Sequence, residues 1–527
     1  MTKKDNTPST PVPGSAPAKI KGKVRIPTIF EALLPIVVMV ALMLYGFLVN
    51  KDGYHDAHMP LVVAISVACF VGAACGHSFA DMLDGMLQRL NATMEAILIL
   101  LTVGLLISSF MMSGTIPSII YYGLKLLTPK WFLPVGAFLC AIVGLACGSS
   151  WTTTATMGIA FVGIGAGLGI NPALTAGMII SGAYVGDKFS PLSDTTNLAA
   201  AVSETGLFDH VTAMISTTGP VFLISLILYT VIGLFIKVKD YDPAVAAGIQ
   251  ESLKNTFVIS PVLMIPILVV IFACVVKMPG LVGVMLSVVT GVVFALIFQK
   301  GYGNIGDIFN ILHYGPSFET GNALVDKLLA KGGMDHQMWT VNLILLAVSY
   351  GGALERCGCV EALFGGLKKR IKTVGGLVLT TMITSLFCDA AMGDQFLGIG
   401  VPAPLYIEKY DELGLGRNML SRTLEDCGTL WACMFPWTAC GAYQSGVLGM
   451  NPFMYFPYAF VNLLNPIYAV LMSYLGRNIF WADGSYTNVL GKTVKKKPAE
   501  APAEAHKLAV ANLERRREQG LAPKVNA

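Results

Sequence analysis

The stretch GAYVGDKFSPLSDTTNLAAAV, from Gly182 to Val202, decides how the fold of this chain is interpreted. It places Asp187, Lys188 and Asp194 among hydroxyl and amide side chains, whereas residues 131–186 before it contain no Asp, Glu, Lys or Arg. If these surroundings lie in a membrane, each charge is costly and marks a functional site by default.

The composition of the chain indicates that these residues lie in a membrane. The chain has 527 residues, of which 54% are hydrophobic and 13% charged, and its mean hydropathy is +0.65. Soluble domains carry about 25% charged residues, whereas apolar runs near the ~20 residues that cross a bilayer recur here. We therefore expect an all-α polytopic membrane protein rather than a soluble enzyme. The predicted spans are 28–49, 59–76, 93–112, 131–147, 172–187, 208–236, 257–276, 280–299, 339–354, 374–392, 418–434 and 455–476.

Both ends of the chain are polar and basic. Residues 1–24 are Pro-rich and predicted to be disordered, and 28–49 is too long for a signal-peptide core, so we expect a retained span. Residues 481–527 form a basic tail whose later part could be a short surface helix. By the positive-inside rule both termini are cytoplasmic, which implies an even number of crossings.

Two pairs of segments indicate an internal repeat. Residues 104–129 resemble 345–373, and 167–196 resemble 414–440, in the same order. The predicted halves are 25–236 and 255–480, joined by a loop at 237–254. The segment 113–130 carries two lysines and its counterpart 356–373 five basic residues, so the two halves are expected to have inverted topology, as in secondary transporters.

The apolar pattern fails at matching places in each half. The first pair is 147–158 and 388–398, and the second is 186–197 and 424–441, with Pro191 and Pro436 at near-equivalent points. Proline removes a helical hydrogen bond, and freed backbone groups at membrane depth require protein or a water-filled cavity around them. We expect two broken helices and two re-entrant hairpins around a polar cavity.

Hard cations such as Na⁺ prefer oxygen ligands, which these segments supply. We place Na⁺ at Asp187, Asp194, Ser193 and Thr195. The full set of expected proton- or cation-binding residues is Asp187, Asp194, Asp389, Asp394, Ser149, Ser193, Thr195, Asn197 and Thr438.

A second set could contact a substrate or balance charge: Lys188, Arg422, Glu425, Asp426, Ser190, Thr196, Ser150 and Thr153. Lys188 and Arg422 could each hold a carboxylate substrate, or only neutralise nearby acids. The hydroxyls around Ser149 could simply cap a helix. Glu425 and Asp426 could instead lie near a cytoplasmic face beside Arg422.

These motifs resemble a known family. SGAYVGDKFSPLSDTTNLA (181–199) is similar to the signature of the NhaC sodium:proton antiporters, and LSRTLEDCGT (420–429) with PWTACGAYQSGVLG (436–449) resembles their second motif. GDQFLGI (393–399) also resembles a stretch of that family. The likeness covers roughly 28–480, but Thr438-Ala439 stands where Asn-Thr is expected, and VPAPLY (401–406) departs from the usual form.

The resemblance implies a bacterial inner-membrane antiporter with a scaffold and a moving transport domain, forming an elevator-type homodimer in membrane lipid. We expect Na⁺ export in exchange for H⁺ by alternating access. The alternative is a Na⁺- or H⁺-coupled exchanger of small organic acids or amino acids, such as malate or lactate. Apart from the transported ions we expect no cofactor, because the chain has no phosphate-binding G-x-x-x-x-G-K-[ST] loop, and no nucleic-acid partner.

Overall fold

The computed structural model describes residues 24–45, 57–235, 243–276, 278–302, 304–366 and 371–524. They are predominantly helical, as predicted, and every predicted span overlaps a helix. The predicted disordered segment 1–24 lies outside the described residues except for its last position. The first half contains α1 (Ile29–Leu44), α2 (His58–Ala74), α3 (Phe79–Met112), α4 (Thr115–Leu126), α5 (Pro129–Cys147), α6 (Ser150–Thr153), the π-helix η2 (Thr154–Gly158), α7 (Ile159–Gly167), α8 (Pro172–Phe189), α9 (Asp194–Val202) and α10 (Leu207–Phe235).

The rest of the chain also alternates between long and short helices. Residues 237–254, predicted as a loop, include α11 (Pro243–Thr256) from residue 243 onward. The following elements are η3 (Pro261–Met264), α12 (Ile265–Val275), α13 (Gly280–Phe298), α14 (Ile305–Tyr314), α15 (Ala323–Leu329), η4 (Asp335–Gln337), α16 (Met338–Arg356), α17 (Cys359–Phe364), α18 (Val374–Met392), α19 (Gln395–Gly400), α20 (Pro402–Glu412), α21 (Arg417–Ala432), α22 (Ala439–Leu448), α23 (Pro452–Tyr455), η6 (Phe456–Tyr458) and α24 (Phe460–Tyr474).

Within the described residues, six helices are long and apolar enough to cross a membrane, or eight if two bent helix pairs each count as one span. The six are α3, α5, α10, α13, α16 extended by η4, and α18. The other four predicted spans coincide with α1 and α2, which have 16 and 17 residues, and with α8 and α21, which carry buried charges. The chain is therefore a multi-pass membrane protein.

The helices are interrupted where the sequence predicted. α5 ends at Gly148 with φ 62°, and Ser149 caps α6. α18 ends at Gly393 with φ 76°, and Asp394 caps α19. Glycine adopts this left-handed conformation without steric cost, which makes it suited to end a helix.

The other two breaks separate α8 from α9 and α21 from α22. Each contains a proline, Pro191 or Pro436, outside helical structure. A hydroxyl side chain starts the next helix in both cases: Ser193 accepts from the Thr196 N–H and Thr438 from the Gly441 N–H.

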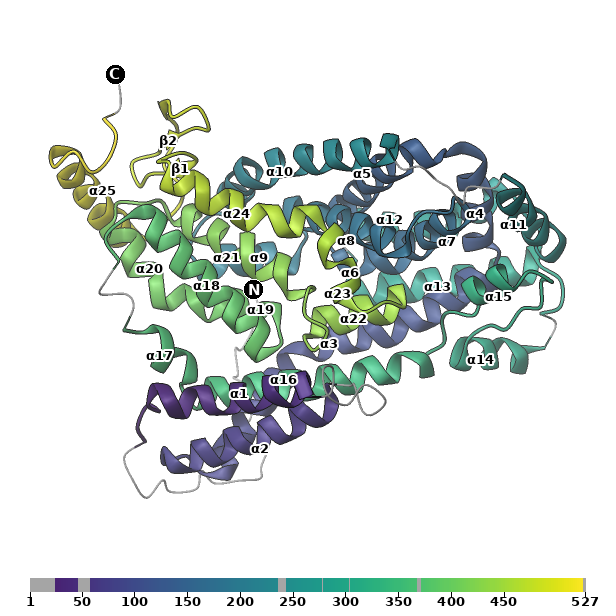
Figure 1. Cartoon of the computed structure of the whole chain (residues 1–527), viewed down its shortest axis with the longest axis horizontal. Coiled ribbons are helices and arrows are strands. Elements are labelled where there is room, and N and C mark those ends of the chain that lie inside the picture. Colours follow the sequence, from purple (N-terminus) through teal and green to yellow (C-terminus); the bar gives the residue numbers. More distant parts are fainter. Residues whose placement is uncertain are drawn as a thin grey trace, which may run out of the picture.

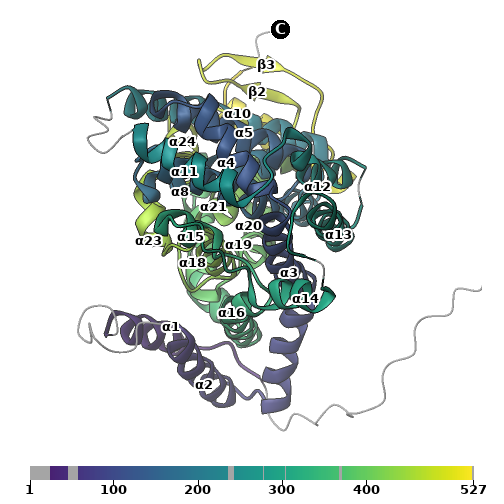
Figure 2. The ribbon, with the colours of Figure 1, turned by 90° about the vertical axis from the view of Figure 1, so that its right-hand side faces the viewer.

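The two halves pack in corresponding ways. α3 runs along α16; α5 packs on α8 and α10, as α18 packs on α21 and α24. α8 also contacts α24 and α21 contacts α10, so the halves interlock. α1 and α2 lie beside α16, on the side of the molecule opposite α5 and α10 (Figures 1 and 2). The inverted topology and the division into scaffold and transport domain remain predictions.

The C-terminal residues form a small module that departs from the all-α prediction. The strands β1 (Ile479–Phe480), β2 (Ser485–Thr487) and β3 (Thr493–Lys495) make an antiparallel sheet in that order. The predicted surface helix is present as α25 (Ala503–Glu518), which packs on α20. This module lies at one end of the molecule, and α11, α14 and α15 lie at the other (Figure 1).

Candidate functional site

Asp187 connects the end of α8, where one break of the first half begins, to the start of α6, where the other break ends. It lies near the end of α8, and its Oδ2 accepts hydrogen bonds from the Ser150 N–H and hydroxyl at 3.1 and 2.7 Å. The first N–H groups of a helix have no partner within it, so a carboxylate at the start of α6 is stabilised there. Asp187 is only 4% exposed.

A cavity of about 70 Å³ adjoins Asp187 and is lined by both halves of the chain. Asp187 and Asp194 come from the first half, and Gln395 and Phe396 at the start of α19 come from the second. The hydroxyls in its lining are those of Ser149, Ser150, Ser193 and Thr195.

The cavity therefore contains all four residues at which Na⁺ was predicted. Its volume accommodates a small ion with water, since one water occupies about 30 Å³ in the liquid. Among the described residues, no group of three or more His, Cys, Asp or Glu could hold a metal ion. A cation here would be held by carboxylate and hydroxyl oxygens together.

Two further carboxyl groups lie at the break of the second half. Asp394 Oδ1 accepts from the Phe396 N–H at 3.2 Å. Asp389 in α18 is fully buried, and neither of its carboxyl oxygens has a hydrogen-bond partner among the described residues. A Cβ built on Gly398 would lie 2.0 Å from Asp389 Oδ1, so α19 approaches this carboxyl group closely because residue 398 is glycine.

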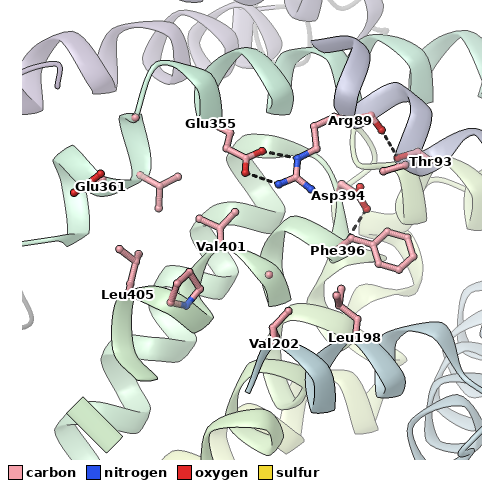
Figure 3. A pocket seen from close by; sticks show the side chains of 15 residues that line it. Arg89, Thr93, Leu198, Val202, Glu355, Glu361, Asp394, Phe396, Val401 and Leu405 are labelled. Atoms are coloured by element: carbon pink, nitrogen blue, oxygen red, sulfur yellow. Dashed lines mark hydrogen bonds and ion pairs between the residues drawn. The ribbon is translucent and has the colours of Figure 1, made fainter. Parts of the chain in front are cut away.

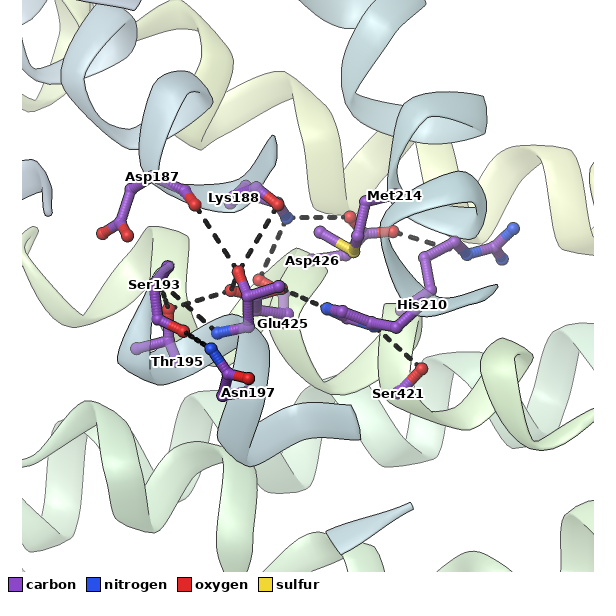
Figure 4. Close-up of polar contacts among 12 residues, drawn as sticks. Asp187, Lys188, Ser193, Thr195, Asn197, His210, Met214, Ser421, Glu425 and Asp426 are labelled. Atoms are coloured by element: carbon purple, nitrogen blue, oxygen red, sulfur yellow. Dashed lines mark hydrogen bonds and ion pairs between the residues drawn. The ribbon is translucent and has the colours of Figure 1, made fainter. Parts of the chain in front are cut away.

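Lys188 is directed away from the cavity into a buried network on α21 (Figure 4). Its Nζ donates to Asp426 Oδ1 at 2.9 Å and to the Glu425 carbonyl at 3.1 Å. Asp426 Oδ1 also accepts from Thr217 at 3.1 Å and Asn465 at 2.7 Å. Buried charges are stable only when they are paired and hydrogen-bonded. In this network the charges of Lys188 and Asp426 are paired with each other.

Glu425 is held by a second set of partners in the same region (Figure 4). Its carboxylate contacts His210 Nε2 at 2.8 Å and accepts from the Thr195 hydroxyl at 2.9 Å. His210 Nδ1 contacts Ser421 Oγ at 2.9 Å. Thr195 thus links this network to the cavity beside Asp187. Glu425 and Asp426 are both fully buried.

Arg422 is also fully buried. Its Nη1 donates to the Asn478 carbonyl at 2.7 Å, and its Nε lies 3.6 Å from Asp426 Oδ2, while Nε and Nη2 have no hydrogen-bond partner among the described residues. Neither Lys188 nor Arg422 lines the 70 Å³ cavity, and their contact with a carboxylate substrate stays a prediction.

Five other predicted residues make hydrogen bonds within the protein and do not line the 70 Å³ cavity. Asn197 and Thr438, predicted as cation ligands, are among them. Asn197 donates to the Pro191 and Ser193 carbonyls, Thr438 to the Ala432 carbonyl, Thr153 to the Ser149 carbonyl and Thr196 to Glu425 Oε1, while Ser190 Oγ accepts from the Leu192 N–H.

A larger cavity, of about 590 Å³, lies between the α3–α16 pair with α17 and the elements α9, α19 and α20 (Figure 3). We call it the Arg89 chamber. Arg89 of α3 and Glu355 of α16 line it and form a bidentate ion pair, in which Arg89 Nε donates to Glu355 Oε2 at 2.5 Å. Asp394 also lines it.

Sequence reasoning missed His210, Asn465, Arg89 and Glu355. His210 and Asn465 are polar residues within the predicted spans 208–236 and 455–476, and that signal could have identified both. Arg89 and Glu355 lie just outside the predicted spans 93–112 and 339–354, where charged residues are ordinary, so nothing local distinguished them.

Interlocked, interrupted helices around buried carboxyl groups define a secondary membrane transporter. Comparison with known proteins identifies it further: the chain belongs to the Na⁺/H⁺ antiporter family, whose model matches residues 24–196 and 182–477. It is therefore an antiporter and not an enzyme.

Three relatives cover nearly the whole transporter. The Na⁺/H⁺ antiporter NhaC of Alkalihalophilus pseudofirmus is 34% identical over 85% of this chain and 96% of its own length. The arginine/ornithine antiporter ArcD of Halobacterium salinarum is 36% identical over 87% of this chain and 94% of its own length. The malate-2H⁺/Na⁺-lactate antiporter of Bacillus subtilis is 33% identical over 88% of this chain and 98% of its own length. Relatives of similar identity thus carry different substrates.

Proposed function

We propose that this protein exchanges Na⁺ for protons across the bacterial inner membrane, exporting Na⁺ by alternating access. The observation that carries the proposal is the 70 Å³ cavity in which Asp187 and Asp194 face hydroxyl groups at the meeting point of broken helices. The basic ends of the chain favour cytoplasmic termini.

In this proposal, a proton and Na⁺ compete for the carboxylate of Asp187. The two hydrogen bonds from Ser150 keep Oδ2 oriented, and Ser149, Ser193 and Thr195 offer neutral oxygens. Asp194 adds a second carboxylate in the cavity lining. Lys188 does not neutralise Asp187, because it is paired with Asp426. The further carboxyl groups, Asp389 and Asp394, are candidates for additional proton binding.

The same proposal assigns motion to the broken helices. The 70 Å³ cavity and the Arg89 chamber both lie where α9 and α19 meet α3. A transport domain built on α5, α8, α18 and α21 would slide against a scaffold containing α3 and α16. An elevator-type homodimer in membrane lipid, with its scaffolds in contact, fits this division.

The experiment is Na⁺-driven proton flux in liposomes that contain the purified protein and an internal pH dye. Asp187→Asn should abolish the flux, because an amide cannot take up and release the proton and offers Na⁺ no charged oxygen. Asp326→Asn is the matched control: Asp326 accepts from the Thr320 N–H and hydroxyl at 2.7 and 2.6 Å but lines neither cavity. Full flux in Asp187→Asn would contradict the proposal.

A second candidate function is exchange of a small organic acid or amino acid on the same fold. Two of the relatives carry such substrates by name, and the volume of the Arg89 chamber favours it, because small organic ligands occupy cavities of about 300–1,000 Å³. Proton flux that appears only after an organic substrate is added would select this function.

A further inference from the structure

The Arg89 chamber is far larger than a monovalent cation requires. It has two unlike sides: Glu355, Arg89 and Asp394 lie along one, and Leu198, Val202 and Leu405 along the other (Figure 3). A few placed polar groups opposite an apolar wall are typical of a site for a small organic molecule.

Arg89 is the group in this chamber best suited to bind a ligand carboxylate. A guanidinium presents a planar fork of donors that matches a carboxylate, and Glu355 already occupies this fork in bidentate fashion. A ligand carboxylate would take the place of Glu355 with little change in geometry.

The Arg89–Glu355 pair is more exposed than the buried Lys188–Asp426 pair. The Arg89 and Glu355 side chains are 30% and 36% exposed, whereas Lys188 and Asp426 are both 0% exposed. Partly exposed ion pairs are weak, whereas breaking a fully buried pair leaves an uncompensated charge. Glu355 can therefore yield its place to a ligand, and Asp426 cannot.

The charges of the lining select among organic ligands. The chamber's charged side chains are one guanidinium, that of Arg89, and three carboxyl groups, those of Glu355, Glu361 and Asp394. A dicarboxylate would face these acids with a single basic partner. A ligand with one carboxylate and two positively charged groups complements the lining, and Glu355, once released from Arg89, needs a cation.

We propose that the Arg89 chamber binds a basic α-amino acid, with Arg89 on its carboxylate, Glu355 on its α-ammonium group and the acidic side chains of Asp394 and Glu361 around its side-chain cation. The inference rests on the proposed sliding of α9 and α19 against α3. It does not require that Asp187 exchanges Na⁺ for protons.

The test compares Arg89→Gln with Arg25→Gln in the full-length protein. Arg25 also forms a bidentate ion pair, with Glu31, but it lines neither of the cavities that Arg89 lines. Calorimetric titration with L-arginine and L-malate measures binding, and counterflow of labelled L-arginine in liposomes measures exchange. We expect Arg89→Gln to weaken L-arginine binding about tenfold or more, as loss of a charge-assisted hydrogen bond does, and Arg25→Gln to leave it unchanged.

Two further variants separate binding from a structural role. Arg89→Lys keeps the charge but loses the fork, so it should fold normally and still bind L-arginine weakly. The double variant Arg89→Glu with Glu355→Arg restores an ion pair between the helices with reversed charges. If it restored L-arginine binding, the pair would serve only to join α3 to α16, and the inference would be overturned.

Na⁺-driven proton flux, measured in the same liposomes without amino acid, separates the two proposals. Flux without L-arginine binding overturns the chamber assignment and leaves Na⁺/H⁺ exchange intact. L-arginine exchange without such flux supports the chamber and contradicts Na⁺/H⁺ exchange. Binding of L-malate in place of L-arginine overturns the assignment of the ligand class.

Discussion

Asp187 and Lys188 are adjacent in sequence but belong to different surroundings. Asp187 accepts hydrogen bonds from Ser150 at the start of α6, beside a cavity, whereas Lys188 joins α8 to α21 through Asp426. Lys188, its neighbour in the sequence, therefore does not neutralise the Asp187 carboxylate. Under the proposed function, this separation allows one motif to carry both a structural cation and a carboxylate for transport.

We expect Lys188→Met to lower the free energy of unfolding by about 3–5 kcal/mol, because it leaves Asp426 buried without its closest cation. The double variant Lys188→Met with Asp426→Leu should be less destabilised, since it removes both charges. Thermal unfolding in detergent measures both. If Lys188→Met unfolded at the same temperature as the wild type, Arg422, 3.6 Å from Asp426, would be sufficient to stabilise the Asp426 carboxylate.

At the scale of single residues, the sequence identified the acidic candidates but not their partners. Charges inside apolar segments are visible without a structure, which is why Asp187, Asp389 and Asp426 could be named. Lys188 and Asp426 are separated by 238 residues, and no local spacing encodes a contact over that distance. His210 was missed although it is ionisable within a predicted span.

At the scale of helices, the contact between α18 and α19 depends on one glycine. A Cβ on Gly398 would meet Asp389 Oδ1 at 2.0 Å, while Gly248 in α11 has nothing within 4 Å of such a position. We expect Gly398→Ala to impair transport and to cost about 1–3 kcal/mol of stability, as overpacking does. Gly248 lines neither cavity; Gly248→Ala is the control and should behave as wild type in flux and melting assays. Equal behaviour of the two variants would contradict this close approach.

The helix breaks were predictable because their chemistry is local. Gly148 and Gly393 end helices, prolines interrupt the others, and Ser193 and Thr438 are good caps. The strands β1–β3 were not predictable, because segments of two or three residues are too short to show a period of two. The packing between the halves determines which breaks adjoin the same cavity, and a sequence pattern does not contain that information.

At the scale of the whole molecule, the C-terminal module fastens both halves at one end. The Glu500 N–H donates to Asp209 at 2.9 Å in the first half, and Asn512 donates to the Asp411 carbonyl at 3.1 Å in the second. Leu513 of α25 is fully buried, whereas Leu508 of the same helix is 52% exposed. The module would therefore move together with the elements that it joins.

We expect Leu513→Asp to release α25, because burying a leucine side chain contributes about 1.5–3 kcal/mol and a buried unpaired carboxylate opposes folding. Limited proteolysis of the purified protein should then cut within residues 503–518. Leu508→Asp is the matched control and should stay resistant. Resistance of both variants would mean that Leu513 does not anchor the helix.

The length of α3 ties the protein to the thickness of its bilayer. At about 1.5 Å per residue, its 34 residues extend about 51 Å, against a hydrocarbon layer of about 30 Å. Every charged residue of α3 lies between Asp81 and Glu95, and residues 96–112 carry none. A thicker membrane would draw the charged part of α3 toward lipid, and a thinner one would expose its apolar part to water, each at an energetic cost. Hydrophobic mismatch would thus act on the helix that forms one wall of both cavities, so lipid chain length becomes a physical control on transport rate.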